Sequence, residues 1–140
     1  AGIVAYRKVR STQLVPYPQV KETLKILKKN KMKLGVVSDA PKLNVWLRLT
    51  EMGLTDFFDV VIGYEDSGEK KPSPKPFKKA LNLLKLKPEE VLFVGDSPNR
   101  DILGAKKVGM KTCLAKYGQV YKGDNADYKI KNFGEILRLK

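Results

Sequence analysis

The stretch Val91-Leu-Phe-Val-Gly-Asp-Ser-Pro-Asn-Arg-Asp101 decides the fold class, because it joins an apolar strand to a polar turn with two carboxylates. Four consecutive apolar residues are typical of a strand buried on both faces of a parallel sheet. Gly95 allows a sharp turn at the end of this strand, where open parallel sheets bind their ligands. Asp96 and Asp101 are costly to bury there unless a cation neutralises them. The stretch therefore predicts an α/β fold with a metal or phosphate site.

Helical and strand patterns alternate on both sides of this stretch. Apolar residues at 3.6-residue spacing predict helices, and short apolar runs between them predict strands. The alternation predicts a Rossmann-like parallel sheet with right-handed crossovers and helices on both faces. The predicted helices span residues 18–29, 41–52, 74–86, 99–108 and 133–139, the predicted strands span 33–37, 59–63, 91–94, 111–115 and 128–130, and polar loops span 64–73 and 117–127.

Length and composition indicate a single domain without a membrane span. The 140 residues are enough for one hydrophobic core. The longest apolar runs fall far short of the roughly 18 residues that cross a bilayer, and no signal-peptide pattern is present, so we expect a soluble, cytoplasmic protein. Cys113 is the only cysteine and histidine is absent, which excludes an intrachain disulfide and imidazole chemistry.

The formal net charge of +13 suits a lysine-rich solvated surface, a surface that steers anions, or a nucleic-acid binder. The lysines are scattered near predicted helix ends and are not interleaved with arginine and aromatic residues, as they are in single-strand binders. This distribution favours solvated helix faces, so neither a nucleic-acid nor a membrane partner is expected. The high lysine content also hints at a thermophilic source.

Two other segments carry groups that suit an anion. Ser38 and Asp39 follow the predicted strand 33–37, where a hydroxyl and backbone N–H groups can bind a phosphate oxygen; the alternative is an ordinary helix N-cap. Lys71 is followed by Pro72, and the restricted backbone reduces the entropy cost of directing its ammonium at a phosphate or carboxylate. The alternative for Lys71 is an ordinary solvated loop.

Asp96 and Asp101 form the stronger candidate site. A carboxylate at position 101 suits the first turn of a helix, whereas Asp96 at the strand end has no such structural explanation. Magnesium fits this sparse set of hard oxygen ligands, because it retains several waters and needs few carboxylates. A receiver-type aspartyl phosphate acceptor is the competing interpretation.

In this order, Val36-Val-Ser-Asp39, Lys71-Pro-Ser-Pro-Lys-Pro-Phe77 and the run from Val91 to Met110 resemble motifs two, three and four of the haloacid dehalogenase (HAD) superfamily. The resemblance covers residues 16–140 and is greatest to archaeal phosphatase-like members with a helical cap. It implies a HAD-like core domain at 16–140 and a remnant of a cap domain, or a linker, at 1–15.

The resemblance implies magnesium-dependent phosphoryl transfer from a small phosphorylated metabolite through an aspartyl-phosphate intermediate. Ser38 would hydrogen-bond the phosphoryl group beside Asp39, and Lys71 would stabilise its charge and the nucleophile. Asp96 would bind Mg²⁺, with Asp101 supporting the metal site through a water molecule or through contacts to the metal's ligands. The catalytic set implied is thus Ser38, Lys71 and Asp96, and we expect these three side chains to converge on one crevice.

The sequence departs from the family at its start. Members begin with a strand that ends in Asp-x-Asp, which provides the nucleophile and the general acid/base, and residues 1–37 contain no aspartate. We therefore expect the central strand of the sheet to be missing, as in a truncated or processed piece of a longer enzyme, unless another segment or copy supplies it. The run from Ala1 to Tyr6 fits either the end of a helix or a strand.

Three functions stay open. The chain is the carboxyl-terminal core of a HAD-type phosphatase that is inactive unless complemented, or a noncatalytic or split-partner domain that binds anions and self-associates through an open sheet. A 2-haloacid dehalogenase is the third possibility, because Lys71 suits either chemistry.

Overall fold

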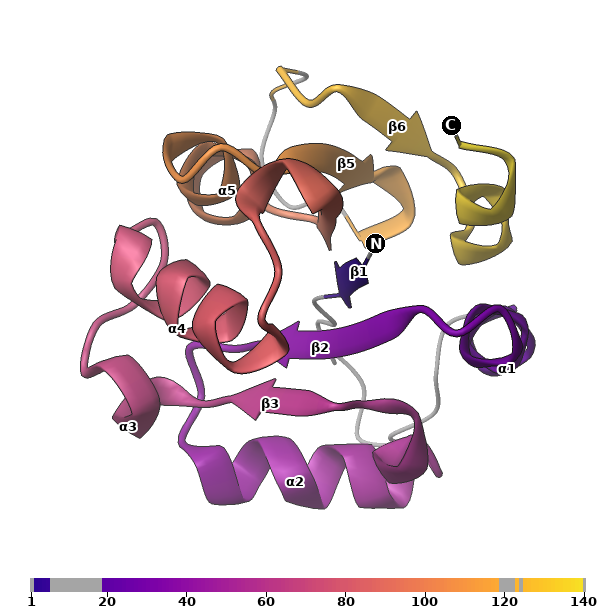
Figure 1. Cartoon of the computed structure of the whole chain (residues 1–140), viewed down its shortest axis with the longest axis horizontal. Helices are drawn as coiled ribbons and strands as arrows, with labels where there is room; N and C mark the ends of the chain where they lie inside the picture. The colour runs from indigo at the N-terminus through magenta and orange to yellow at the C-terminus, as the bar shows by residue number, and fades with distance from the viewer. Residues whose placement is uncertain (1, 6–18, 119–122, 124, 140) are drawn as a thin grey trace.

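The computed structural model describes residues 2–5, 19–118, 123 and 125–139, and a six-stranded sheet forms its centre. The strand order is β3-β2-β1-β4-β5-β6, and every neighbouring pair is parallel (Figure 1). The predicted α/β class is confirmed. The strands are β1 (Gly2–Ala5), β2 (Lys33–Val37), β3 (Val60–Ile62), β4 (Val91–Gly95), β5 (Lys111–Ala115) and β6 (Tyr128–Ile130).

The α-helices α1, α2 and α4 agree with the predicted ones to within two residues at each end, whereas other helical segments differ, and the short 3₁₀ turns η1, η2 and η4 were not predicted. The predicted helix 99–108 is a π-helical turn followed by a short α-helix, the closing helix is 3₁₀, and the loop 64–73 contains a short helix, α3. Four residues are too few to show helical periodicity, which explains why α3 was not predicted. The helices are α1 (Val20–Lys29), α2 (Lys42–Glu51), η1 (Thr55–Phe57), α3 (Tyr64–Ser67), α4 (Pro74–Leu84), η2 (Pro88–Glu90), η3 (Pro98–Ile102), α5 (Leu103–Lys107), η4 (Lys116–Gly118) and η5 (Phe133–Arg138).

The sheet is covered on both faces, so its side chains divide into two cores. Alternate strand residues such as Val36 and Val94 pack with α1, α2 and η5 on one face. Val37 and Phe93 pack with α4 and α5 on the other face, where the rings of Phe77 and Phe93 meet edge to face at 4.9 Å. Figure 1 shows α4 and α5 on one side of the sheet, and α1 on the other.

The centre of the sheet is occupied by β1, which corrects the expectation of a missing central strand. Gly2 and Ile3 pair in parallel with Lys33 and Leu34 of β2, and Ala5 pairs with Val94 of β4. The physical reason is that β2 and β4 would otherwise leave facing rows of backbone groups without partners in a protein interior. Ala1-Gly-Ile-Val-Ala-Tyr is thus a strand over residues 2–5, whereas the rest of the proposed cap remnant, residues 6–15, lies outside the described residues.

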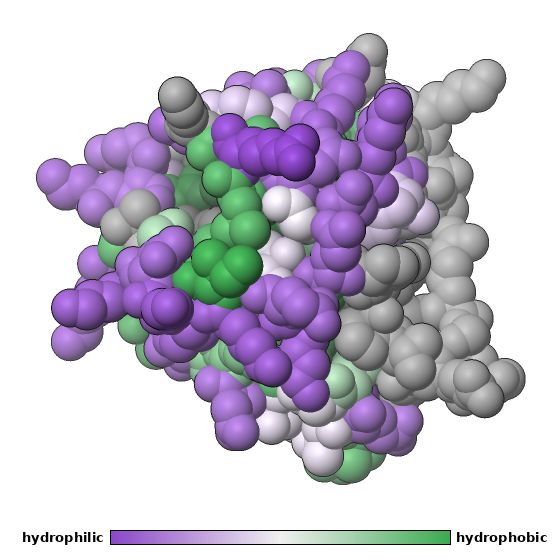
Figure 2. All heavy atoms as spheres, turned by 90° about the vertical axis from the view of Figure 1, so that its right-hand side faces the viewer, coloured by the Kyte–Doolittle hydropathy of each residue, from purple (hydrophilic) through white to green (hydrophobic). Residues whose placement is uncertain are grey.

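The surface is largely hydrophilic on the face shown in Figure 2, with a hydrophobic area between the polar side chains. This face is the right-hand side of Figure 1, where α1 lies. The exposed large apolar residue of α1 is Ile26. In the part of the chain that the structure describes, no helix has the length and apolar character needed to cross a membrane.

Asp59 connects α1, β2 and the residue before β3. Its carboxylate accepts hydrogen bonds from the Leu34 amide at 2.8 Å and from Lys28 Nζ at 3.1 Å. Burial raises the pKa of Asp59, but the Leu34 amide and the charge of Lys28 outweigh burial and hold this pKa below its ordinary value. A carboxylate with a lowered pKa stabilises the fold above the pKa of the unfolded chain, and this contribution disappears as the pH falls through the folded-state pKa.

We therefore expect Asp59→Asn to lower the free energy of unfolding at pH 7 by less than about 1 kcal/mol, since the pair is half-exposed. At pH 3 the difference between wild type and variant should be smaller, because the wild-type carboxyl is protonated in a larger fraction of molecules than at pH 7. Urea unfolding at both pH values measures the difference, with the exposed Asp56→Asn as the control. A difference that is as large at pH 3 as at pH 7 would contradict the charge-based origin.

Candidate active site

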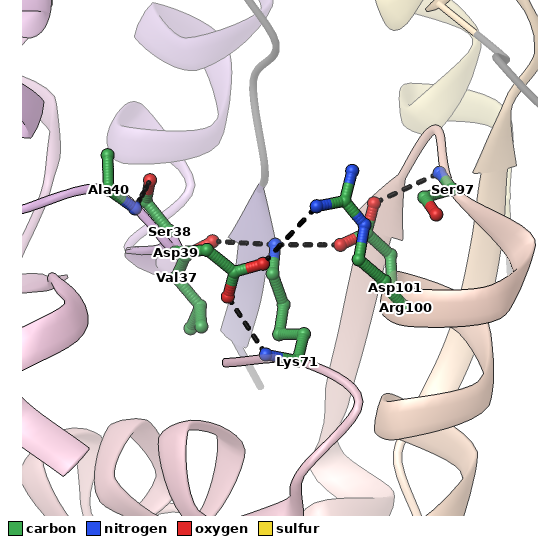
Figure 3. A network of polar contacts seen from close by, with 8 residues as sticks. All are labelled: Val37, Ser38, Asp39, Ala40, Lys71, Ser97, Arg100 and Asp101. Carbon is green, nitrogen blue, oxygen red and sulfur yellow. Dashed lines mark hydrogen bonds and ion pairs between the residues drawn. The ribbon is translucent and has the colours of Figure 1, made fainter. Parts of the chain in front are cut away.

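The candidate site lies at the carboxyl edge of the parallel sheet, where β2 leads into Ser38 and β4 leads into Asp96. Because β1 lies between β2 and β4, these two strand ends are two inter-strand spacings apart, roughly 9.5 Å. The loop that carries Lys71 spans this separation. Figure 3 shows the side chains that meet there from the three segments.

Lys71 is the link between the two strand ends. Its Nζ donates to the Val37 carbonyl at 3.2 Å and to Asp101 Oδ1 at 2.7 Å, and it lies 5.9 Å from the centroid of the Phe93 ring. The Lys71 and Asp101 side chains are each only 1% exposed. The alternative of an ordinary solvated loop is therefore wrong for Lys71, because a solvated lysine would extend its ammonium into water.

Asp101 is positioned by the turn after β4. Its Oδ1 accepts from Lys71, its Oδ2 accepts from the Ser97 amide at 3.0 Å, and its own amide donates to the Ser97 carbonyl at 2.8 Å. Gly95 permits this packing, since a Cβ there would lie 2.3 Å from the Cβ of Asp101. Both Asp101 oxygens thus already accept hydrogen bonds, which fits the supporting role in the metal site better than direct coordination.

Asp39 connects the other two loops. Its Oδ1 accepts from the Lys71 backbone amide at 2.9 Å, and its Oδ2 lies 3.5 Å from Nη1 of Arg100. Ser38 Oγ accepts from the Ala40 amide at 3.1 Å. The N-cap residue of α2 is Pro41 and no side chain caps this helix, so the N-cap alternative for Ser38 and Asp39 is wrong.

Asp96 and Ser97 supply buried oxygen atoms at the end of β4. Asp96 is 4% exposed, and the Ser97 hydroxyl is buried without a hydrogen-bond partner among the described residues. Hard oxygen ligands of this kind suit Mg²⁺, which binds through one or two carboxylates and retains waters. Within residues 2–5, 19–118, 123 and 125–139, no group of three or more acidic, cysteine or histidine residues is arranged so that it could hold a metal ion.

Cys113 does not belong to the site. It lies in the middle of β5 and is fully buried. Burial, together with the nearby charge of Glu135, raises the pKa of the Cys113 thiol to about 12. The thiol is protonated at neutral pH and is not a nucleophile, because the thiolate is the reactive form.

The structure connects most of the sequence-predicted site residues, but through contacts that the sequence did not reveal. Lys71 contacts Asp101 and Asp39 directly, and it contacts Ser38 only through the carbonyl of the preceding Val37. Sequence analysis missed Arg100 as part of this network, although its place directly before Asp101 is a usable signal. The assignment of roles to these residues stays a prediction.

Removing the carboxylate of Asp101 should strongly destabilise the protein. Asp101→Asn leaves the Lys71 ammonium buried without its counter-ion, which typically costs about 3–5 kcal/mol of unfolding free energy. Lys71→Met combined with Asp101→Leu should recover much of this loss, because neither member of the pair is then left buried without the other. Urea unfolding of the single and double variants measures it.

The exposed ion pair between Lys75 and Glu69 provides the control, and Glu69→Gln should change the unfolding free energy little. Equal effects of Asp101→Asn and Glu69→Gln would show that the buried pair does not have the strength assigned to it.

The chain is similar to known phosphatases over most of its length. It is 40% identical over 144 residues to a glyceraldehyde 3-phosphate phosphatase from Pyrococcus furiosus, covering 99% of this chain and 60% of that protein. It is 42% identical over 125 residues to a phosphoglycolate phosphatase from Aquifex aeolicus, covering 89% of this chain and 58% of the relative. This chain therefore spans less than two thirds of the length of these relatives.

A solved structure and a family model agree with these relatives. The crystal structure of a HAD phosphatase from Thermococcus onnurineus superposes with a TM-score of 0.82 at 38% identity, over 87% of this chain and 56% of that one. Residues 3–115 match the model of the haloacid dehalogenase-like hydrolases. The chain belongs to the haloacid dehalogenase-like hydrolase family.

Proposed function

We propose that this chain is the carboxyl-terminal part of a magnesium-dependent phosphatase that hydrolyses a small phosphorylated metabolite. The observation that carries the proposal is the buried Lys71 ammonium, held between the end of β2 and the turn after β4 by Val37 and Asp101. A fixed cation at the carboxyl edge of a parallel sheet is placed to stabilise charge that develops on a transferring phosphoryl group. The names of the relatives, which include phosphatases of glyceraldehyde 3-phosphate and phosphoglycolate, support this substrate class.

Each residue has a role that follows from its placement. The Ser38 hydroxyl, which accepts a hydrogen bond from the Ala40 amide, donates its own proton to a phosphoryl oxygen. Asp39 holds the Lys71 backbone at the site through its hydrogen bond to the Lys71 amide. Asp101 holds the Lys71 ammonium in position and keeps the pair electrically neutral.

Asp96 is the residue that would hold Mg²⁺, with Asp101 as its supporting neighbour. The buried oxygen atoms of Asp96 and Ser97 at the end of β4 support this assignment. When bound, the ion would supply positive charge that neutralises the phosphoryl oxygens.

None of the site residues assigned above provides the nucleophilic carboxylate, so it has to come from another segment. No aspartate precedes Asp39, and the residues that follow β1 in the sequence are Tyr6-Arg7-Lys8. We propose that an upstream segment bearing Asp-x-Asp completes the site in the full enzyme, consistent with the fraction of the relatives' length that this chain spans. Such a segment would have to take the central position that β1 occupies here.

The occupied centre of the sheet favours a second candidate, a noncatalytic domain that retains an anion site. In that case β1 completes the sheet permanently and brings no carboxylate with it. Anion binding at Ser38 and Lys71 would then persist without turnover, and the chain would act by binding alone.

Phosphate release measured with magnesium separates the two candidates. We expect no turnover by the 140-residue chain and turnover after fusion of an amino-terminal strand that ends in Asp-x-Asp. The matched control is the same fusion with its first aspartate replaced by asparagine, which should stay inactive. Magnesium-dependent turnover by the unfused chain would overturn the phosphatase proposal as stated, and an inactive fusion that still binds phosphate would favour the noncatalytic domain.

A further inference from the structure

Arg100 lies in the η3 turn between the exposed Asn99 and the buried Asp101. Asp101 and Ser97 are almost fully buried, whereas the Arg100 side chain is 40% exposed although it follows the same turn at the end of β4. Its guanidinium extends toward Asp39, on the loop after β2 (Figure 3). Arg100 therefore reaches from the buried layer of the site to its rim.

The contact between Arg100 and Asp39 is loose. Its distance of 3.5 Å exceeds the roughly 2.7–2.9 Å of a charge-assisted N–H···O bond. Within the described residues this is the one polar contact of a guanidinium that has five N–H donors. A loose and partly exposed pair contributes little to stability, so its loss to a competing anion costs the fold little.

The two ion pairs of the site therefore differ in how easily each can be broken by a competing anion. The Lys71–Asp101 pair is buried and short, and breaking it would leave a charge in the protein interior. The Arg100–Asp39 pair can open toward solvent, because both side chains reach the surface to some extent. An anion at the rim can thus bind the Arg100 guanidinium in place of Asp39 without disturbing the Lys71–Asp101 pair.

We propose that Arg100 is a subsite at the rim for a second anionic group, a carboxylate or a second phosphate, on a substrate whose phosphoryl group lies at Ser38 and Lys71. This inference rests on the proposed function, which places the phosphoryl group there. The planar fork of a guanidinium matches the two oxygens of a carboxylate or phosphate, so the recognised class is a phosphate ester with a second negative group close by.

The contribution of Asp39 follows from the same geometry. Its Oδ1 accepts from the Lys71 amide at 2.9 Å, so it stays in place when Arg100 leaves. It then stands at the rim as a carboxylate without its arginine, which disfavours the entry of further anions. In the absence of substrate, Asp39 is thus the carboxylate that faces the Arg100 guanidinium at the rim.

The test compares ligands that differ only in the second group. Phosphoglycolate and ethyl phosphate share the phosphate ester and the two-carbon chain, but only phosphoglycolate has a carboxylate; pyrophosphate tests a second phosphate. Titration calorimetry of the full 140-residue chain with excess magnesium should show phosphoglycolate, pyrophosphate or both binding about tenfold more tightly than ethyl phosphate. The ligand that binds more tightly than ethyl phosphate identifies the second anionic group as a carboxylate or a phosphate.

Arg100→Gln should reduce this preference to less than about twofold and leave binding of inorganic phosphate unchanged within about twofold. Arg100→Lys should keep part of the preference, since it retains charge but not the fork. Arg100→Gln combined with Asp39→Asn leaves the net charge unchanged and should lose the preference equally. Lys106→Gln removes an exposed charge from α5 and should keep the wild-type preference.

The outcomes separate the two proposals. An equal preference in wild type and Arg100→Gln, with inorganic phosphate still bound, overturns the subsite and leaves the proposed function standing. A failure of wild type to bind inorganic phosphate or ethyl phosphate overturns the anion site at Ser38 and Lys71 in this chain, and the subsite with it, whereas phosphate release by the Asp-x-Asp fusion tests the proposed function separately. A loss of preference in Lys106→Gln would assign the effect to net charge and would also overturn the subsite.

Discussion

The buried ion pair between Lys71 and Asp101 is the interaction on which the rest of the site depends. Two charges that are each 1% exposed stabilise one another, because either one without the other would be an uncompensated charge in a medium that solvates it poorly. Their Nζ···Oδ1 distance of 2.7 Å fixes the turn after β4 relative to the loop before α4. The pair therefore sets the geometry of two segments that are far apart in the sequence.

Close packing at Gly95 makes this pair possible. The Asp101 side chain lies against the backbone of Gly95, in the space that a larger residue would fill. The strand end, the turn and the lysine loop thus form one unit, and Asp39 attaches the loop after β2 to it through the Lys71 amide. In this arrangement the cation is held before any ligand arrives, so binding needs little reorganisation of the protein.

How much could be predicted from the sequence differs between elements. The largely apolar runs 33–37 and 111–115 predicted the bounds of β2 and β5 correctly to the residue, because strands buried on both faces leave few alternative interpretations. The strand at 2–5 stayed ambiguous, since a four-residue apolar run has no period to distinguish strand from helix and its partners lie far away in the sequence. Asp39 and Lys71 were found as candidate residues, but their mutual contact and the role of Arg100 depend on loop conformations that no local pattern encodes.

The position of β1 has a consequence for the dynamics of the protein. The hydrogen bonds of β1 to β2 and to β4 join the two halves of the sheet into one continuous sheet. One half contains β3 and β2, and the other contains β4, β5 and β6. If β1 detaches, the amides of both neighbours lose their partners in the same event, so they belong to one cooperative opening unit. The strands that lead into Ser38 and Asp96 would then both lose their pairing with β1. The integrity of the site is therefore coupled to the fraying of a four-residue strand.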